Sequence, residues 1–477
     1  MRDLSTLYIN GAFVTPHGQD RLDLIDPRTG ERQGSVALGD AEDARRAIAA
    51  AKAAYRTYAR TSLAERGRIL QRLHDVVRPR IDDLTEVMIT EYGAPASVCR
   101  ATATRAANAF LHAKAVMEGF AFVRTYGEAQ VTMEPLGVVG LITPWNASNG
   151  FICGKMAMAL AAGSTVVIKP SELSAAQTQL LLECLHEAGV PPGLFNVVNG
   201  RGDVVGKAIT EHPDIAKISF TGSTAVGKAI ARGAAETMKR ITLELGGKSP
   251  NVILDDADLA TAIPLAVRAA FHNNGQACIA GTRLLVPRSR VDEIKRLAKA
   301  AVEAVVVGDP HRPETQIGPL VTATQYERVQ RYIQLGLAQG AELVTGGPGH
   351  PAGLERGYFV RPTLFAGVTR DMTIAQEEIF GPVLSLMTYG SDDEAVDLAN
   401  DTVYGLQAYV SSTNLERARA VASRIVAGRV FINGLYDDPR APFGGFKQSG
   451  IGRESGAFGL EAYLEPKAVF GTERSAS

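Results

Sequence analysis

The chain has few cysteines, histidines and tryptophans, and no excess of charge of either sign. Its 477 residues include 4 Cys, 8 His and 1 Trp, and 50 basic side chains face 51 acidic ones. This balance lacks the basic footprint of a nucleic-acid-binding protein, so no nucleic-acid partner is expected. The cysteines form no CxxC pair, which argues against a metal site, and their low density is typical of a reducing compartment.

Long apolar runs are missing as well. Residues 1–10 contain no hydrophobic stretch of the kind found in signal peptides. An apolar run such as Leu136–Ile142 is far too short to span a bilayer. We therefore expect a cytoplasmic protein without a membrane partner. The length exceeds that of one compact core, so two or more domains are expected.

The order of helical and strand-like segments predicts an α/β fold. Residues 40–80 predict two helices, capped by Asp40 and Ser62. From residue 138, short β-branched runs alternate with amphipathic stretches, as expected of βαβ units around parallel sheets. Strands are predicted at Val138–Ile142, Val166–Lys169, Leu194–Val198, Ala216–Phe220, Ile241–Leu245, Asn251–Leu254, Arg283–Val286, Pro382–Thr388, Gln407–Ser411 and Arg429–Ile432. Helices are predicted at Ala175–Ala188, Thr224–Ala235, Val291–Val305, Thr322–Leu337 and Leu415–Val426.

Two further segments bear on domain organisation. The pair Gly246-Gly247 breaks both helix and strand, so it is the expected seam between two α/β units. Phe120–Glu134 alternates polar and apolar residues around Gly127, which predicts a hairpin. Because an isolated hairpin is only marginally stable in water, we expect it to pack on another subunit.

Two side chains carry the strongest chemical signal. Cys278 lies in a loop of small residues, where a lone cysteine can serve as a nucleophile. Glu244 lies between a predicted strand and the Gly246-Gly247 turn, where a lone carboxylate can serve as a base. An enzyme that forms a thioester and then hydrolyses it needs both groups.

Four of the other motifs allow two interpretations, and a fifth allows one. Phe220–Gly227 is either a phosphate-binding strand-to-helix turn or an ordinary turn. Val166–Glu172 either holds ribose hydroxyls or is a surface lysine with a capping serine. Asn146 is either an oxyanion donor or a turn residue. Gln376–Pro382 looks like a helix end before a strand, and the glycine-rich residues Ala441–Glu454 are either a linker or the wall of a pocket.

The ordered set of motifs resembles the aldehyde dehydrogenases over essentially the whole chain. The motifs that carry the resemblance are Pro144–Asn146, Lys169–Glu172, Phe220–Gly227, Leu243–Pro250, Gly275–Cys278, Glu377–Val383 and Pro442–Glu454. The resemblance implies a Rossmann-like parallel-sheet cofactor domain (1–119 and 138–246) and a second α/β catalytic domain (247–446). It also implies a small β oligomerisation arm (120–137 and 447–477), and hence a homodimer or homotetramer.

The resemblance also implies a role for each motif residue. Cys278 is the expected nucleophile, Glu244 the base that activates water, Asn146 the oxyanion donor and Lys155 an electrostatic group nearby. The expected cofactor contacts are Trp145, Lys169, Ser171, Glu172, Gly222, Ser223, Gly227, Leu245, Glu378 and Phe380. The expected substrate-pocket residues are Ala147, Phe151, Gly154, Ala277, Ile279 and Phe443.

The implied reaction is oxidation of an aldehyde to a carboxylic acid through a thioester. Because Glu244 supplies a base for hydrolysis, transfer of the acyl group to coenzyme A is disfavoured. NAD is the expected cofactor, since Glu172 would repel a 2′-phosphate, while Lys169 and Ser171 leave NADP as the alternative. Small pocket residues favour a bulky or aromatic aldehyde. The competing hypotheses are a non-catalytic cofactor-binding relative and a thiol acyltransferase or esterase that needs no nicotinamide.

Overall fold

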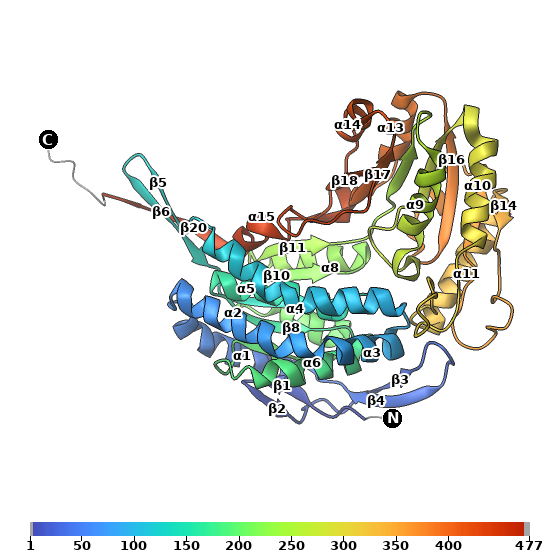
Figure 1. The fold of residues 1–477 in the computed structure, drawn as a ribbon. Coiled ribbons are helices and arrows are strands. Elements are labelled where there is room, and N and C mark those ends of the chain that lie inside the picture. Colours follow the sequence, from blue (N-terminus) through green and yellow to red (C-terminus); the bar gives the residue numbers. More distant parts are fainter. Residues whose placement is uncertain (1–2, 472–477) are drawn as a thin grey trace.

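The computed structural model describes residues 3–471; residues 1–2 and the last six residues of the predicted arm, 472–477, lie outside the described part. Helices cover each of two large mixed sheets, and a narrow three-stranded sheet projects from the first (Figure 1). This is the α/β fold expected from the alternating pattern.

The first large sheet has five parallel strands at its centre and antiparallel strands at both edges. Its order is β19 (Gly450–Ile451), β11 (Arg240–Glu244), β10 (Ile215–Thr221), β7 (Val138–Ile142), β8 (Thr165–Lys169), β9 (Phe195–Val197), β1 (Leu7–Ile9) and β2 (Ala12–Val14). The central strands are buried on both faces, which explains their continuous apolar runs.

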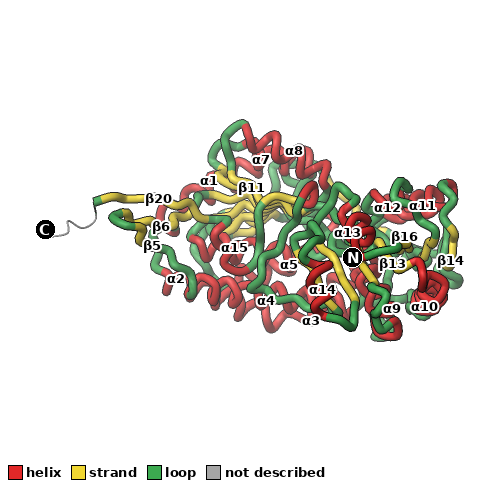
Figure 2. Tube along the Cα trace, turned by 90° about the horizontal axis from the view of Figure 1, so that it is seen from above, coloured by secondary structure: helices red, strands yellow, loops and turns green. Residues whose placement is uncertain are grey.

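Helices cover both faces of this sheet (Figure 2). One face carries α1 (Ala41–Tyr58), α7 (Lys207–Glu211) and α8 (Thr224–Ala235). The other carries α2 (Leu63–Val77), α4 (Ala96–Glu118), α5 (Ser148–Ala162), α6 (Ala175–Glu187) and α15 (Gly456–Glu461), with α3 (Ile81–Tyr92) packed on α4 and α6. Asp40 and Ser62 cap α1 and α2 as predicted. Helix α5 escaped prediction because its side chains are buried nearly all round, which removes the amphipathic signal.

The second large sheet has six parallel strands and one antiparallel edge strand. Its order is β14 (Glu342–Thr345), β15 (Thr363–Ala366), β16 (Val383–Tyr389), β13 (Arg283–Pro287), β12 (Pro250–Ile253), β17 (Gln407–Ser411) and β18 (Arg429–Ile432). Its two apolar cores hold α9 (Leu259–Phe271) and α10 (Val291–Glu303) on one side and α11 (Ala323–Ala338), α12 (Thr373–Gln376), α13 (Asp392–Asn400) and α14 (Leu415–Ala422) on the other.

The projecting sheet pairs the predicted hairpin with the end of the chain. Strands β5 (Val123–Tyr126) and β6 (Ala129–Pro135) form the hairpin, and β20 (Leu464–Phe470) pairs with β6. Residues 447–463, which the sequence analysis assigned to the arm, lie elsewhere: β19 pairs with β11, and α15 packs on α4 and α5. A separate ribbon, β3 (Arg21–Ile25) with β4 (Arg32–Ala37), lies near the N-terminus. Across residues 3–471, no helix has both the length and the apolar surface that crossing a bilayer requires.

Candidate active site

The order of strands in the first sheet marks a place for a ligand. The chain runs from β7 outward to β8 and β9, then returns to place β10 and β11 on the other side of β7. In open parallel sheets, ligands bind beyond the carboxyl ends of the strands where the order reverses. Here that point lies between β7 and β10, which lead into Trp145-Asn146 and Gly222-Ser223 respectively.

Asn146 joins this edge to the loop that carries Cys278. Its side-chain Nδ2 donates to the Gln276 carbonyl at 2.9 Å. In return, Asn273 Nδ2 donates to the Asn146 carbonyl at 2.9 Å. The exchange fixes the Asn146 amide beside the cysteine loop, and its second N–H donates to no group in residues 3–471.

An unusual backbone precedes Cys278. Asn273, Asn274 and Gly275 all adopt left-handed φ, at 56°, 61° and 70°. A Cβ on Gly275 would lie 2.3 Å from the Gly381 carbonyl carbon, so only glycine fits there. Asn274 holds the turn with its side chain, which donates to the Gly93 and Pro319 carbonyls and accepts from the Gly318 amide. Several partners thus hold a strained segment next to the predicted nucleophile.

Cys278 itself occupies a tight turn. The Ala280 amide donates to the Ala277 carbonyl at 3.0 Å, so Cys278 and Ile279 are the central residues of the turn. The side chain is half-buried, and burial, with the charges of Glu378 and Glu244, raises the pKa of the Cys278 thiol to about 12. Without a nearby cation the sulfur is therefore held as a thiol at neutral pH.

Glu244 ends β11 and is 2% exposed. Neither carboxyl oxygen has a hydrogen-bond partner among the described residues. Burial, together with the charge of Glu454, raises the pKa of Glu244 well above its usual value. A buried carboxyl with both oxygens free is a strong candidate for a functional group, because structural carboxyls in this setting are normally paired.

Lys155 lies beside this carboxyl and is buried. Its Nζ donates to Ser219 Oγ at 3.0 Å and forms a short ion pair with Glu454. Ser219 Oγ also donates to Glu454 Oε1 at 3.1 Å. The sequence analysis quoted Glu454 in a motif but assigned it no role. Only the fold brings it to Lys155, because 299 positions separate the two residues.

The predicted cofactor contacts lie along the carboxyl edge of the first sheet. Lys169, at the end of β8, pairs with Glu172 at 2.8 Å, and Ser171 Oγ accepts from the Leu173 amide. Ser223 is the N-cap of α8, and its Oγ accepts from the Val226 amide at 3.3 Å. Gly227 leaves room for Leu245, whose side chain packs where a Cβ would stand. An exposed helix N-terminus and a nearby carboxylate are the groups that suit a pyrophosphate and a ribose.

Glu378 and Phe380 face this edge from the second sheet. Glu378 Oε1 accepts from the Gly247 amide at 3.0 Å, and burial raises the pKa of Glu378 to about 7. Phe380 adopts a left-handed φ of 64°, and its ring meets Trp145 edge-on at 5.4 Å. Helix α11 holds this segment, a feature that the sequence analysis missed. Its Gln325 donates to the Phe380 carbonyl at 2.7 Å, and its Arg328 donates to the Glu378 carbonyl at 2.6 Å.

The predicted substrate residues come from three segments. Ala147, Phe151 and Gly154 lie at the start of α5, and a Cβ on Gly154 would meet no atom within 4 Å. Ala277 and Ile279 flank Cys278 in its turn. The amides and carbonyls of Phe443 and Glu454 bond to each other at 2.7 Å, which links the third segment to the Lys155 cluster.

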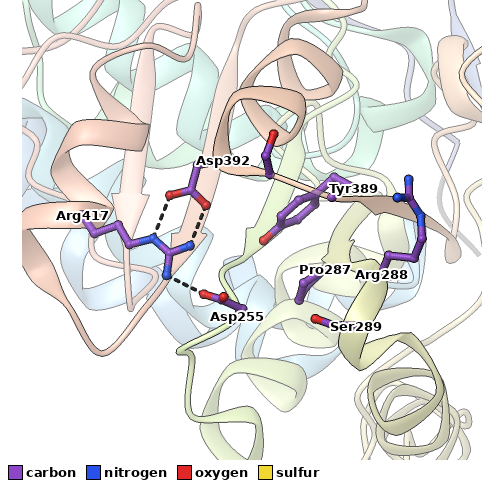
Figure 3. Close-up of a pocket in the computed structure, with 9 residues that line it drawn as sticks. Asp255, Pro287, Arg288, Ser289, Tyr389, Asp392 and Arg417 are labelled. Carbon is purple, nitrogen blue, oxygen red and sulfur yellow. Dashed lines mark hydrogen bonds and ion pairs between the residues drawn. The ribbon is translucent and has the colours of Figure 1, made fainter.

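One cavity lies away from these groups (Figure 3). It measures about 550 Å³ and follows the carboxyl ends of β13 and β16, where Arg417 pairs with Asp255 and Asp392. Cys278 and Glu378 precede the amino ends of the same two strands, so the cavity is at the opposite edge of the sheet. None of the predicted site residues lines it.

The fold is that of a two-sheet α/β protein, with a cysteine, a glutamate and an asparagine between the sheets. Comparison with known proteins narrows this class: the chain belongs to the aldehyde dehydrogenase family, whose model matches residues 13–469. A 3-succinoylsemialdehyde-pyridine dehydrogenase from Pseudomonas sp. is 46% identical over 477 residues, 100% of each chain.

Solved structures agree. An aldehyde dehydrogenase C mutant from Pseudomonas syringae, in complex with NAD+ and octanal, superposes with a TM-score of 0.97. It is 46% identical, and the match covers 99% of this chain and 98% of that one. An NAD+ complex of an aldehyde dehydrogenase from Bacillus cereus has a TM-score of 0.94 and 37% identity, covering 98% of this chain and 96% of that one.

Proposed function

We propose that this protein oxidises an aldehyde to a carboxylic acid with NAD+. The observation that carries the proposal is the meeting of three groups: the Cys278 turn, the Asn146 amide bonded to that turn, and the buried carboxyl of Glu244. Cys278 and Glu244 are close enough for the charge of Glu244 to raise the pKa of the thiol.

The first half-reaction forms the thioester. The Cys278 thiolate adds to the aldehyde carbonyl carbon, and the oxygen takes the negative charge. The free N–H of Asn146 and the backbone N–H of Cys278 donate to that oxygen. When bound, the nicotinamide would supply an acceptor for the hydride and a positive charge near the sulfur. Loss of the hydride restores the C=O bond and leaves an acyl group on Sγ.

The second half-reaction hydrolyses the thioester. Glu244 takes a proton from water, the oxygen attacks the acyl carbon, and the C–S bond breaks to release the acid and the thiolate. Glu244 can act only when ionised. Lys155 lowers its pKa and Glu454 raises it, so the ion pair between Lys155 and Glu454 tunes the base.

The residues present fit a dinucleotide. Ser223 offers the α8 N-terminus to the pyrophosphate, and Lys169 with Glu172 offers a carboxylate to the adenosine ribose. Glu172 would repel a 2′-phosphate, which favours NAD over NADP. Glu378 and Phe380, held by α11, flank the nicotinamide side.

The substrate we propose is a bulky or aromatic aldehyde. Ala147 and Ala277 are small, and open space surrounds the position of a Cβ on Gly154. The relative from Pseudomonas sp. is named for a substrate that carries a pyridine ring, and the solved Pseudomonas syringae relative holds octanal. Both of these compounds are compatible with a wide substrate tunnel.

For assembly, we propose a homodimer or homotetramer built through the projecting sheet. Its outer strands carry exposed apolar side chains, including Tyr126 at 62% and Phe470 at 76% exposure. Within the described residues neither edge strand, β5 or β20, pairs with a further strand, and an exposed strand edge is a template for pairing with another chain. We assign residues 120–137 and 464–471 to the arm, residues 1–119 and 138–246 to cofactor binding, and residues 247–446 to the acyl chemistry. Four free cysteines suit a cytoplasmic location.

A panel of aldehydes, from acetaldehyde to aryl aldehydes, tested with NAD and with NADP and reported as kcat/KM, tests the proposal. Reduced nicotinamide formed in proportion to the acid supports it, and Cys278→Ala should abolish that signal. Acyl transfer that proceeds without nicotinamide would indicate a thiol acyltransferase or esterase instead. Cofactor binding without turnover of any aldehyde would indicate a non-catalytic relative.

A further inference from the structure

The turn that carries Cys278 rests on a buried tyrosine of the second sheet. Tyr409, in the middle of β17, is 6% exposed, and its hydroxyl donates to the Ile279 carbonyl at 2.9 Å. Its ring also lies against Gly281, where a Cβ would be 3.0 Å from two ring carbons. Tyr409 therefore contacts the turn at the residues that follow Cys278.

A second side chain orients the tyrosine. Gln407, two residues earlier on the same face of β17, donates from Nε2 to the Tyr409 hydroxyl at 2.5 Å. Because that hydroxyl receives the amide hydrogen, its own hydrogen is directed at Ile279. Gln407 is 1% exposed, and its Oε1 has no partner among residues 3–471. The hydrogen bond to the Tyr409 hydroxyl is therefore the interaction that the Gln407 side chain contributes.

The other side of the turn is held by close packing. A Cβ on Gly247 would lie 2.2 Å from the Cys278 carbonyl oxygen, so the backbone at the Gly246-Gly247 seam presses directly on the turn. Two consecutive carbonyls of the turn are thus held: that of Cys278 by packing against Gly247, and that of Ile279 by the hydrogen bond from Tyr409. Of these two interactions, only the hydrogen bond at Ile279 depends on a side chain, which a substitution can change without altering the backbone.

We propose that Tyr409, oriented by Gln407, is a positioning residue for the nucleophile. By holding the Ile279 carbonyl, it fixes the rotation of the turn, so that Sγ and the backbone N–H of Cys278 address the same carbonyl group. Tyr409 acts through this turn, which its hydroxyl and ring contact at Ile279 and Gly281. The inference rests on the proposed function of Cys278. Small displacements of a nucleophile are costly, since a shift of about 1 Å can lower a rate by about 10²-fold.

The test compares Tyr409→Phe with a matched control in the same sheet, Tyr389→Phe. Tyr389 is 3% exposed, and its hydroxyl donates to the Ile253 carbonyl at 2.7 Å, at the opposite edge from the Cys278 turn. Both variants lose one buried hydroxyl and one hydrogen bond to a backbone carbonyl. Tyr409→Phe also loses the hydrogen bond that Gln407 donates, so thermal unfolding should shift in both variants and further in Tyr409→Phe.

Kinetics should separate the two variants. Tyr409→Phe should lower kcat by about tenfold or more while the KM for NAD stays unchanged, and it should slow alkylation of Cys278 by iodoacetamide. Tyr389→Phe should leave both rates as in the wild type. Equal kinetics in the two variants, or an unaltered kcat in Tyr409→Phe, would overturn the proposal.

Two further variants complete the design. Gln407→Leu should lower kcat in the same direction but less, and it should add nothing when combined with Tyr409→Phe, because both act through one hydrogen-bonded chain. If Tyr409→Phe fails to fold, Gln407→Leu decides the matter, and an unchanged kcat there overturns the proposal. Full activity in Cys278→Ala would instead defeat the proposed function, which separates the two failures.

Discussion

Replacing Glu244 by glutamine separates the two halves of the proposed reaction. The side chain keeps its size but loses the ability to accept a proton from water. Because general-base catalysis contributes about 10²–10⁴-fold, hydrolysis of the thioester should slow by that factor, while its formation should not. Each subunit should then form one equivalent of NADH in a rapid burst, followed by slow turnover, and mass spectrometry should find an acyl group on Cys278.

Stability gives an independent measure of the same carboxyl. Its pKa is raised in the folded protein, so the folded state holds a proton that the unfolded state releases. The folded state therefore loses stability as pH rises above the usual carboxyl pKa, by about 1.4 kcal/mol for each pH unit until the folded pKa is reached. Glutamine cannot titrate, so Glu244→Gln should gain stability relative to the wild type as pH rises above the usual carboxyl pKa.

Glu91 provides the control. It is another carboxyl whose pKa is raised by burial, to about 7, but it accepts from the Ala176 and Gln177 amides at the start of α6. Glu91→Gln should lose stability and keep steady-state turnover without a burst. A Glu244→Gln enzyme that releases acid at the wild-type rate, or that shows neither burst nor acyl-enzyme, would refute the role of Glu244 as the hydrolytic base.

Four other outcomes follow from the site. Because the pKa of the Cys278 thiol is raised to about 12, alkylation of the free enzyme should accelerate with pH throughout the neutral and alkaline range, and NAD should accelerate it at pH 7; a plateau near pH 7 without NAD would contradict this. Gly154→Trp should fill the open space beside it and lower kcat/KM for aryl aldehydes far more than for acetaldehyde, and equal losses would argue against a wide tunnel. Glu172→Ala should raise the KM for NAD and reduce the preference for NAD over NADP, as measured by initial rates with each cofactor. Removing residues 464–471 should give a smaller assembly, as measured by light scattering, because the projecting sheet loses strand β20. An unchanged number of subunits would place the interface elsewhere.

Local patterns were enough for much of the fold. The caps at Asp40 and Ser62 and the β-branched runs of both sheets were visible in the sequence, because capping and alternation depend on neighbours a few residues apart. Helix α5 was not visible, since a helix buried all round has no polar face. The place of residues 447–463 was also hidden, because β19 finds its partner β11 some two hundred residues away.

The site divides in the same way. The sequence was sufficient to indicate thioester chemistry, because the identities and the order of Cys278, Glu244 and Asn146 are visible in it. The fold alone decided which distant groups support the residues of the site: Glu454 pairs with Lys155, α11 holds Phe380, and Tyr409 holds the turn of the nucleophile. These contacts join segments that are separated by tens to hundreds of residues. Sheet order and packing set their geometry, and local patterns along the chain carry no record of either.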